Sequence, residues 1–269
     1  MAVCAGRPVA GDRLEELERE LAEAKLALAR RADFIACLTH EIRTPLTGVI
    51  GVAQMLMGGL AGQLSEEQRR FVDKICASGE HLLELVNRTL DLSAMSAGKL
   101  ELELEEVDLV PLAGQAVSVA AAMALERRQS MELFVSGGYR PWAKGDPLAL
   151  RQVLMNLLGN ACKYAHEGSR IVVSVCPDRT GFARVSVADD GPGIPPDKLE
   201  RIFVPFERAG DGRDVRAGSG LGLPICRKIV ELHGGDMWVC SEKGWGTLFG
   251  FTVRLTPPPL RQGLENAGA

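Results

Sequence analysis

Apolar residues recur every three or four positions along the first part of the chain. The earliest stretch follows a 3-4-3-4 spacing through Leu14, Leu17, Leu21, Ala24 and Leu28, which is typical of a short coiled-coil seam over residues 13–33. The pattern continues without a helix breaker until Gly58 and Gly59, so one helix is predicted over residues 13–57. Residues 1–12 are small, contain Gly and Pro, and are expected to be disordered.

A second amphipathic helix is predicted from Ser65 to about Met95. Ser65 followed by Gln68 is a capping box, and apolar residues then repeat at helical spacing from Phe71 to Leu92. Two such helices joined by a short loop form a helical hairpin, which buries its apolar stripe poorly by itself. Two copies would bury that stripe in a four-helix bundle, so we expect a homodimer.

The pattern changes near residue 99, where Leu and Glu begin to alternate. Residues 100–104 are predicted to form a strand, and a domain boundary is placed between residues 98 and 99. Beyond it we expect helices over 108–129, 147–164 and 224–232, and strands over 131–135, 171–175, 183–188, 236–241 and 248–255. His233 is expected to cap the last helix. Residues 99–256 therefore form an α/β domain, and residues 257–269 are expected to be a disordered tail.

Composition excludes several classes of protein. The net charge is −4 with both signs well mixed, so no nucleic-acid-binding face is expected. Seven cysteines without a C-x-x-C pair indicate reduced thiols, with neither a zinc site nor disulfides. The longest near-apolar run, from Leu109 to Leu125, contains Pro111 and Gln115 and is predicted to be a buried helix rather than a membrane span. Without a signal sequence, a cytoplasmic protein is expected, or the cytoplasmic part of a longer one.

A polar cluster lies on the first predicted helix. His40 and Thr44 are four residues apart and share a face, and Glu41 lies beside them. An imidazole next to a carboxylate can act as a nucleophile, although a solvated surface histidine fits the same pattern. Pro45 predicts a bend one turn after His40, because it has no N–H for the carbonyl of Glu41.

Two further patterns point to a nucleotide. Asn156, Asn160, Lys163 and Tyr164 share one face of a predicted helix, which indicates either a ligand or a solvated face. Glycines immediately before the helix over 224–232 would let backbone N–H groups meet a phosphate. Their spacing, G-x-G-x-G from Gly218 to Gly222, is neither a Rossmann fingerprint nor a Walker A loop.

The whole set of motifs resembles one known family. Residues 34–46 resemble the H-box of the two-component sensor histidine kinases, with the phosphoacceptor histidine, acidic neighbour, Thr and Pro in register. The later motifs resemble, in order, the N, G1, F, G2 and G3 boxes of the Bergerat ATP-binding fold, which these kinases share with gyrase. The resemblance covers residues 34–255. It implies a dimerisation and histidine phosphotransfer domain over 34–98 and a catalytic ATP-binding α/β sandwich over 99–256.

The resemblance also implies a role for individual residues. Asp189 would accept a hydrogen bond from the adenine amino group, and Gly191 and Gly193 would let the backbone approach the base. Asn160 would ligate Mg²⁺ through its amide oxygen, with Asn156 in support. Lys163 would pair with a phosphate, Tyr164 would border adenine or ribose, and Arg208 would reach the terminal phosphate. The other nucleotide contacts are implied at Gly218, Gly220, Leu221, Gly222 and Thr247.

Asn156 separates a kinase from a hydrolase. ATPases of this fold carry a glutamate at that position, and an asparagine cannot act as a general base on water. The resemblance therefore implies that His40 attacks the γ-phosphorus while Glu41 accepts a hydrogen bond from its other ring nitrogen. The phosphoryl group would then pass to an aspartate of a separate response regulator receiver domain. Thr44 resembles the residue that orients water for dephosphorylating that regulator.

Other interpretations remain open. The chain would be a silent scaffold if it bound ATP or a regulator without phosphotransfer, or else a stand-alone ATPase or Ser/Thr kinase of the same fold. Asn156 and the His40 helix count against the stand-alone ATPase and the Ser/Thr kinase. No sensor domain is recognisable before residue 34, so the input would come from a missing N-terminal domain or from a separate sensor protein.

Overall fold

The computed structural model describes residues 10–96, 102–138, 140–178, 181–207 and 220–257. Most of both predicted disordered ends lies outside these ranges, as do Arg208 and Gly218. The chain divides into two compact units, Met1–Glu101 and Leu102–Ala269. Each unit is described by itself below.

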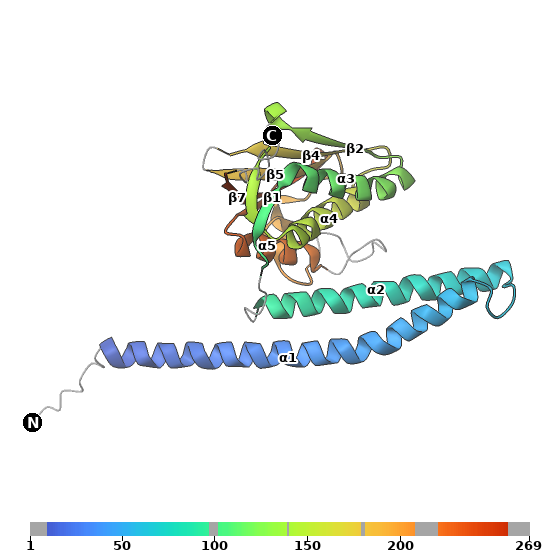
Figure 1. The fold of residues 1–269 in the computed structure, drawn as a ribbon, viewed down its shortest axis with the longest axis horizontal. Helices are drawn as coiled ribbons and strands as arrows, with labels where there is room; N and C mark the ends of the chain where they lie inside the picture. Colours follow the sequence, from blue (N-terminus) through green and yellow to red (C-terminus); the bar gives the residue numbers. More distant parts are fainter. Residues whose placement is uncertain (1–9, 97–101, 139, 179–180, 208–219, 258–269) are drawn as a thin grey trace, which may run out of the picture. The chain divides into compact units, whose positions relative to one another are not determined.

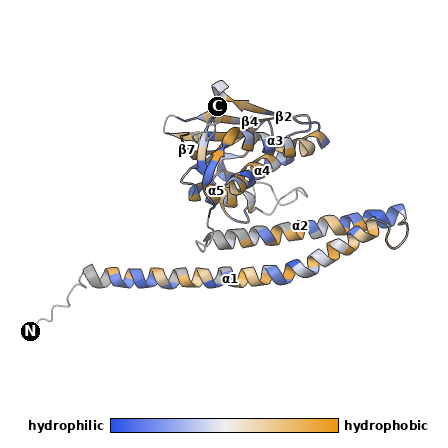
Figure 2. Ribbon diagram, in the orientation of Figure 1, coloured by the Kyte–Doolittle hydropathy of each residue, from blue (hydrophilic) through white to orange (hydrophobic). Residues whose placement is uncertain are grey.

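The first unit is a helical hairpin of α1 (Ala10–Met57) and α2 (Glu66–Ser96) (Figure 1). Helix α1 begins three residues before the predicted start, so residues 10–12 are helical. Ser65 begins α2 as predicted: its N–H donates to Oε1 of Gln68 at 2.9 Å, and its Oγ accepts from the N–H of Gln68 at 3.2 Å. Hydrophobic and hydrophilic positions alternate along both helices (Figure 2), as the spacing predicts.

Helix α1 continues through Pro45 and bends in the C-terminal part that contains this proline (Figure 1). The bend is expected because the proline ring crowds the carbonyl one turn earlier and offers it no N–H. Further along, Gly79 of α2 lies against Ile50 of α1, and a Cβ at residue 79 would meet Cγ1 of Ile50 at 2.7 Å. A larger residue at position 79 would therefore require the Ile50 side chain to move.

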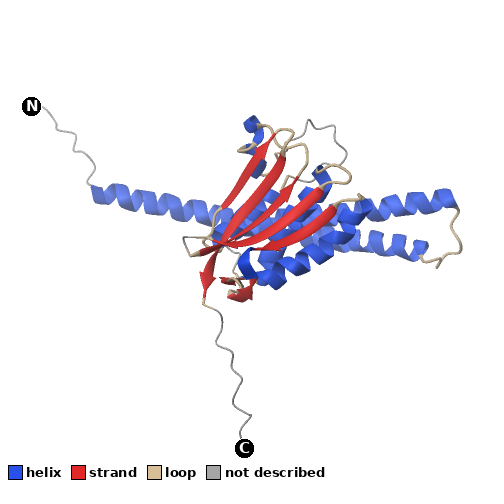
Figure 3. Cartoon of the chain, turned by 90° about the horizontal axis from the view of Figure 1, so that it is seen from above, coloured by secondary structure: helices blue, strands red, loops and turns tan. Residues whose placement is uncertain are grey.

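The second unit is built on one twisted sheet (Figure 3). The strand order is β1-β3-β7-β5-β4-β2, with β6 paired to β7. Of the pairs in the described residues, β2 with β4 is parallel and the others are antiparallel. The strands are β1 (Glu105–Asp108), β2 (Ser130–Val135), β3 (Trp142–Gly145), β4 (Arg170–Pro177), β5 (Phe182–Asp189), β6 (Met237–Glu242) and β7 (Gly246–Thr256).

Three helices pack beside this sheet: α3 (Leu109–Glu126), α4 (Pro147–Tyr164) and α5 (Gly222–Leu232). Among the described residues, only α3 is long and apolar enough to cross a membrane. Six of its residues are buried, and it contacts α4 and β2, as expected for a core helix. The remaining helical turns are the 3-10 segments η1 (Ser136–Gly138), η2 (Pro196–Lys198) and η3 (Arg201–Phe203).

Two short strands correct the sequence prediction. Of the strand predicted over 100–104, the described residues 102–104 are irregular, and β1 begins at Glu105 instead. A strand needs a partner, and β1 finds one in β3, where Val107 pairs with Ala143 and both side chains are buried. Strand β3 was missed because four residues containing Lys and Gly are too short to show a period of two.

His233 is the cap of α5, as predicted, and it also holds α4. Its Nδ1 lies 2.8 Å from the carbonyl oxygen of Ile229, and its Nε2 lies 2.9 Å from the backbone nitrogen of Asp146. The carbonyl can only accept and the N–H can only donate, so Nδ1 carries the proton and Nε2 accepts. Asp146 is the N-cap of α4, so this buried imidazole joins the end of one helix to the start of another.

Replacing Gly250 with alanine should destabilise the second unit. A Cβ at this position of β7 would overlap the Trp238 indole, so the variant should lose about 1–3 kcal/mol of unfolding free energy in a denaturant titration. Gly114→Ala in α3 is the matched control, because its Cβ would make an ordinary contact at 3.8 Å and should add about 0.5–1 kcal/mol. Equal stability of the two variants would contradict the packing of Trp238 on Gly250.

Candidate active site

Helix α4 presents a line of polar side chains beside its apolar stripe. Asn156, Asn160 and Lys163 are half-buried, whereas Leu157 and Leu158 are fully buried. The helix begins at a well-made cap, since Oδ1 of Asp146 accepts the N–H groups of residues 148 and 149 at 2.9 and 3.1 Å. The predicted amides and the lysine therefore lie on one face of a helix that is fixed at its start.

The C-terminal end of α4 is held by two side chains that sequence reasoning missed. The Arg127 guanidinium donates to the carbonyls of Cys162 and Lys163, and Nε2 of Gln129 donates to Cys162 and His166. The last carbonyls of a helix lack partners within it, and these donors supply them. The last turn of α4 is thereby fixed, with the Lys163 ammonium 5.2 Å from the centre of the Tyr164 ring.

Asp189 ends β5, and its side chain is half-buried. The pKa of this carboxyl is raised to about 6, chiefly by burial and to a smaller extent by the neighbouring Asp190 charge. Hydrogen bonds from the backbone N–H groups of Gly191 and Thr247 lower the pKa by favouring the ionised form, and Gly191 N lies 2.9 Å from Oδ1. Asp189 and Thr247 are also paired across β5 and β7, so these predicted site residues lie together.

The glycines after Asp189 are required by the protein itself. A Cβ on Gly191 would meet Oδ1 of Asp189 at 2.6 Å and Cα of Ala165 at 3.0 Å. Gly193 has φ +70° and lies against the backbone of Glu242 in β6. The expected reason for these glycines, approach of the backbone to a base, is untested, whereas their contacts with the carboxylate and with β6 are part of the fold. Through Ala165 the end of α4 lies beside the Asp189 turn.

The start of α5 offers backbone donors. The helix begins at Gly222 after its N-cap Leu221, whose side chain makes no capping hydrogen bond, and the backbone N–H groups at such a helix start suit an anion. Gly220 has φ +72°, and its carbonyl accepts the N–H of Phe206 at 3.1 Å. Leu221 is buried. The described part of the glycine motif thus takes the place before a helix that was predicted, while Arg208 and Gly218 lie outside the described residues.

The histidine cluster lies on the other unit. His40, Glu41 and Thr44 are all exposed on α1, and the Thr44 hydroxyl lies 3.3 Å from the backbone carbonyl of His40. Within the described part of the chain the His40 ring makes no hydrogen bond to Glu41, so that contact stays a prediction. Nearby, Arg43 donates to Oδ1 of Asn87 at 2.7 Å, which ties this part of α1 to α2.

A magnesium ion fits the donors that are present. The described residues contain no cluster of three His, Cys, Asp or Glu side chains, so they hold no all-protein cage for a metal. Mg²⁺ in nucleotide sites takes few protein ligands and is otherwise held by phosphate and water oxygens. A single half-buried amide, Asn160, is consistent with that mode. Together the two units define a class of protein: a nucleotide-binding α/β domain in one chain with a helical hairpin that exposes a histidine.

Each of the two units matches a known protein family. The family described as "Histidine kinase-, DNA gyrase B-, and HSP90-like ATPase" matches residues 145–258, and the "His Kinase A (phospho-acceptor) domain" matches residues 30–98. The circadian input-output histidine kinase CikA of Synechococcus elongatus is 37% identical over 94% of this chain, and the histidine protein kinase DivJ of Caulobacter vibrioides is 36% identical over 91%. The chain spans 34% and 40% of these two relatives.

Solved structures of histidine kinases are similar to this chain as well. Full-length ShkA in complex with AMPPNP is similar with a TM-score of 0.73 and 36% identity, over 85% of this chain and 47% of that one. The histidine kinase ThkA in complex with the response regulator TrrA matches 94% of this chain and 70% of that one, with a TM-score of 0.60 and 26% identity. The chain therefore belongs to the histidine kinases, with a HisKA phosphoacceptor domain followed by a HATPase_c domain.

Nucleotide binding should weaken below about pH 6 because of Asp189. Its raised pKa means that the carboxylate gains a proton as the pH falls through about 6, and the neutral acid is a poorer acceptor for an amino group. From about pH 7.5 to about pH 5 the Kd for Mg·ATP should rise roughly tenfold. Asp189→Asn is the control, since nucleotide phosphates titrate in both proteins. An equal pH dependence in the two proteins would contradict this assignment.

Proposed function

We propose that this chain is the catalytic core of a sensor histidine kinase, which phosphorylates its own His40 from Mg·ATP and passes the phosphoryl group to a response regulator. The observation that carries the proposal is the presence of both halves of this chemistry in one chain. The HisKA unit exposes His40, and the HATPase_c unit contains a half-buried carboxylate, Asp189, and the half-buried amides of α4. The family and the nucleotide-bound relative support ATP as the substrate.

The nucleotide would be held at both ends. Asp189 accepts a hydrogen bond from the base amino group, Lys163 pairs with a phosphate, and the backbone at the start of α5, where no side chain caps the helix, meets the phosphate chain. Asn160 would hold Mg²⁺ through its amide oxygen, and the ion would neutralise charge on the β- and γ-phosphates. The protein's part is thus to fix the terminal phosphate in place.

The nucleophile must then come from the protein. Asn156 has no basic oxygen with which to activate water, so hydrolysis is slow and transfer to a positioned side chain is favoured. One ring nitrogen of His40 attacks the γ-phosphorus, the bond to the bridging oxygen breaks, and ADP leaves with the bonding electrons. Glu41 accepts a hydrogen bond from the other ring N–H and stabilises the positive charge that develops on the imidazole.

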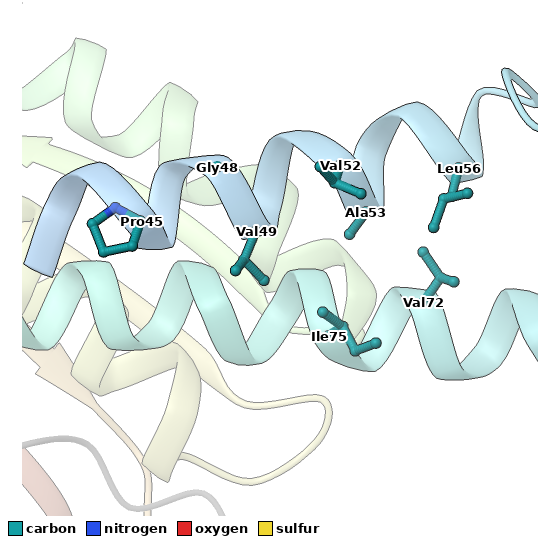
Figure 4. Close-up of a pocket in the computed structure, with 8 residues that line it drawn as sticks. All are labelled: Pro45, Gly48, Val49, Val52, Ala53, Leu56, Val72 and Ile75. Atoms are coloured by element: carbon teal, nitrogen blue, oxygen red, sulfur yellow. The ribbon is translucent and has the colours of Figure 1, made fainter.

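A second copy of the chain would complete the helical unit. An apolar groove of about 480 Å³ runs along the hairpin (Figure 4) and is lined by Pro45, Gly48, Val49, Val52, Ala53, Leu56, Val72 and Ile75. Leu14 and Leu21 of the predicted coiled-coil seam are also exposed, at 59% and 56%. Such a continuous apolar stripe is stable in water only when it is covered, and a homodimeric four-helix bundle covers it.

The partners follow from the family. The ThkA structure contains a response regulator, and we infer a receiver domain with a phosphoacceptor aspartate as the partner in trans.

Because the relatives are longer than this chain, the input would reach the α1 helix from a sensor domain or from a separate sensor protein. We also propose a cytoplasmic site of action, where ATP is available, and a second activity in which Thr44 orients water to dephosphorylate the regulator.

Replacing His40 with alanine should abolish labelling of the protein by γ-labelled Mg·ATP. A phosphohistidine is lost in acid and survives alkali, so the label on the wild-type protein should show this stability. His81→Ala is the matched control, because His81 is also exposed but lies on α2, and it should keep most of the label. Retention of the label in His40→Ala, or a label stable to acid, would contradict a His40 kinase.

Replacing Thr44 with alanine should reduce dephosphorylation of the regulator at least about tenfold while leaving autophosphorylation within about twofold. The hydroxyl would position water, and positioning by one hydrogen-bonding group is worth roughly that much. The measurement follows the decay of a phosphorylated receiver domain after addition of the kinase and Mg·ADP. Thr47→Ala, one turn further along α1 and also exposed, is the control. Unchanged decay in Thr44→Ala would remove the second activity from the proposal.

A further inference from the structure

Ser241 on β6 is the centre of a hydrogen-bond network next to the Asp189 site. Its Oγ lies 2.7 Å from the carbonyl oxygen of Gly246, 2.8 Å from the backbone nitrogen of Ile194 and 3.0 Å from Oγ1 of Thr247. The side chain is half-buried. It therefore joins the turn after Asp189, which contains Ile194, to the start of β7.

The proton positions in this network follow from the chemistry of the partners. A carbonyl can only accept, so the single proton of the Ser241 hydroxyl goes to Gly246. The N–H of Ile194 occupies one Ser241 lone pair. The contact with Thr247 can then be made only if the Thr247 hydroxyl donates its proton to the other lone pair. The Thr247 hydroxyl therefore donates its proton to Ser241 on β6. The two lone pairs of the Thr247 oxygen are left to accept hydrogen bonds from other groups.

The Thr247 hydroxyl lies beside the carboxylate of Asp189. The two residues face each other across β5 and β7, where side chains of paired residues are neighbours on the same face of the sheet. The Thr247 backbone N–H also donates to that carboxylate, and Thr247 is 8% exposed. Two acceptors, a carboxylate and an oriented hydroxyl, are therefore presented side by side at the end of β5.

We propose that Ser241 is a positioning residue for nucleobase selection. Because Ser241 takes the Thr247 proton, the Thr247 oxygen can only accept a hydrogen bond from the base. Thr247 and Asp189 then offer two acceptors, which are complementary to the two N–H donors of an exocyclic amino group. A base with a carbonyl at the same position would place a third acceptor against this pair and leave all three without a proton. The inference rests on the proposed function, in that Asp189 is taken to face the base.

The cost of an unpaired polar atom sets the expected size of the effect on nucleotide preference. A site built to hydrogen-bond one group rejects an analogue that lacks it, because the buried polar atoms are then left unpaired. Without the Ser241 hydroxyl the Thr247 proton loses its acceptor and can rotate towards the base. It can then donate to a carbonyl, so the variant should accept inosine triphosphate, which has a carbonyl where ATP has its amino group, more readily.

The experiment compares the Kd of Mg·ATP with that of Mg·inosine triphosphate for four proteins. Wild type should favour ATP strongly, and Ser241→Ala should reduce this preference about tenfold, by weakening ATP binding and strengthening inosine triphosphate binding. Ser241→Thr retains a hydroxyl and should retain the preference. Ser186→Ala is the matched control, because Ser186 forms another cross-strand hydroxyl pair, with Ser174 of β4 at 2.7 Å, away from Asp189.

The other outcomes distinguish a failure of the Ser241 inference from a failure of the proposed nucleotide site. If Ser241→Ala weakens both nucleotides equally, Ser241 only supports the fold of the turn, and the inference is wrong while ATP binding stands. If Ser241→Ala keeps the full preference, the inference is likewise wrong. If wild type binds both nucleotides equally, or binds neither, then Asp189 does not read the base and the proposed nucleotide site itself fails.

Discussion

A carboxylate half-buried at the end of a strand is stabilised by surrounding donors, and this requirement organises the nucleotide-binding unit. Asp189 receives N–H groups from the turn that follows it and from β7, and these two segments are joined through Ser241. The turn can follow this path only with glycine at positions 191 and 193. These contacts fix the position of the Asp189 carboxylate. Its remaining lone pairs could then accept a hydrogen bond from a nucleotide and so orient that nucleotide.

The second constraint is the separation of nucleotide and nucleophile. The chain forms two compact units, with the Asp189 site on one and exposed His40 on the other. Under the proposed function, Asn156 would not activate water, ATP would be hydrolysed slowly, and reaction would depend on the arrival of the histidine. Such a division lets a signal control the rate by changing the arrangement of the units, without altering either one.

Much of this could be predicted from the sequence, because periodicity and motif order are local properties. The hairpin, the capping box at Ser65, the core helix α3 and the His233 cap are all confirmed, and the family comparison confirms the fold class. Strand β3 and the donors Arg127 and Gln129 were missed, because their importance arises from tertiary contacts with residues far along the chain. The roles of Arg208 and Gly218 stay predictions.

The proposed function requires that the γ-phosphoryl group of ATP passes to a histidine of this chain rather than to water. The most direct measurement is ³¹P NMR of the intact protein at mildly alkaline pH after addition of Mg·ATP. A histidine kinase should give a protein-bound phosphoramidate signal that grows with ADP in equal amount, with little inorganic phosphate. Steady formation of inorganic phosphate with no protein-bound phosphorus would contradict it and would make the chain an ATPase.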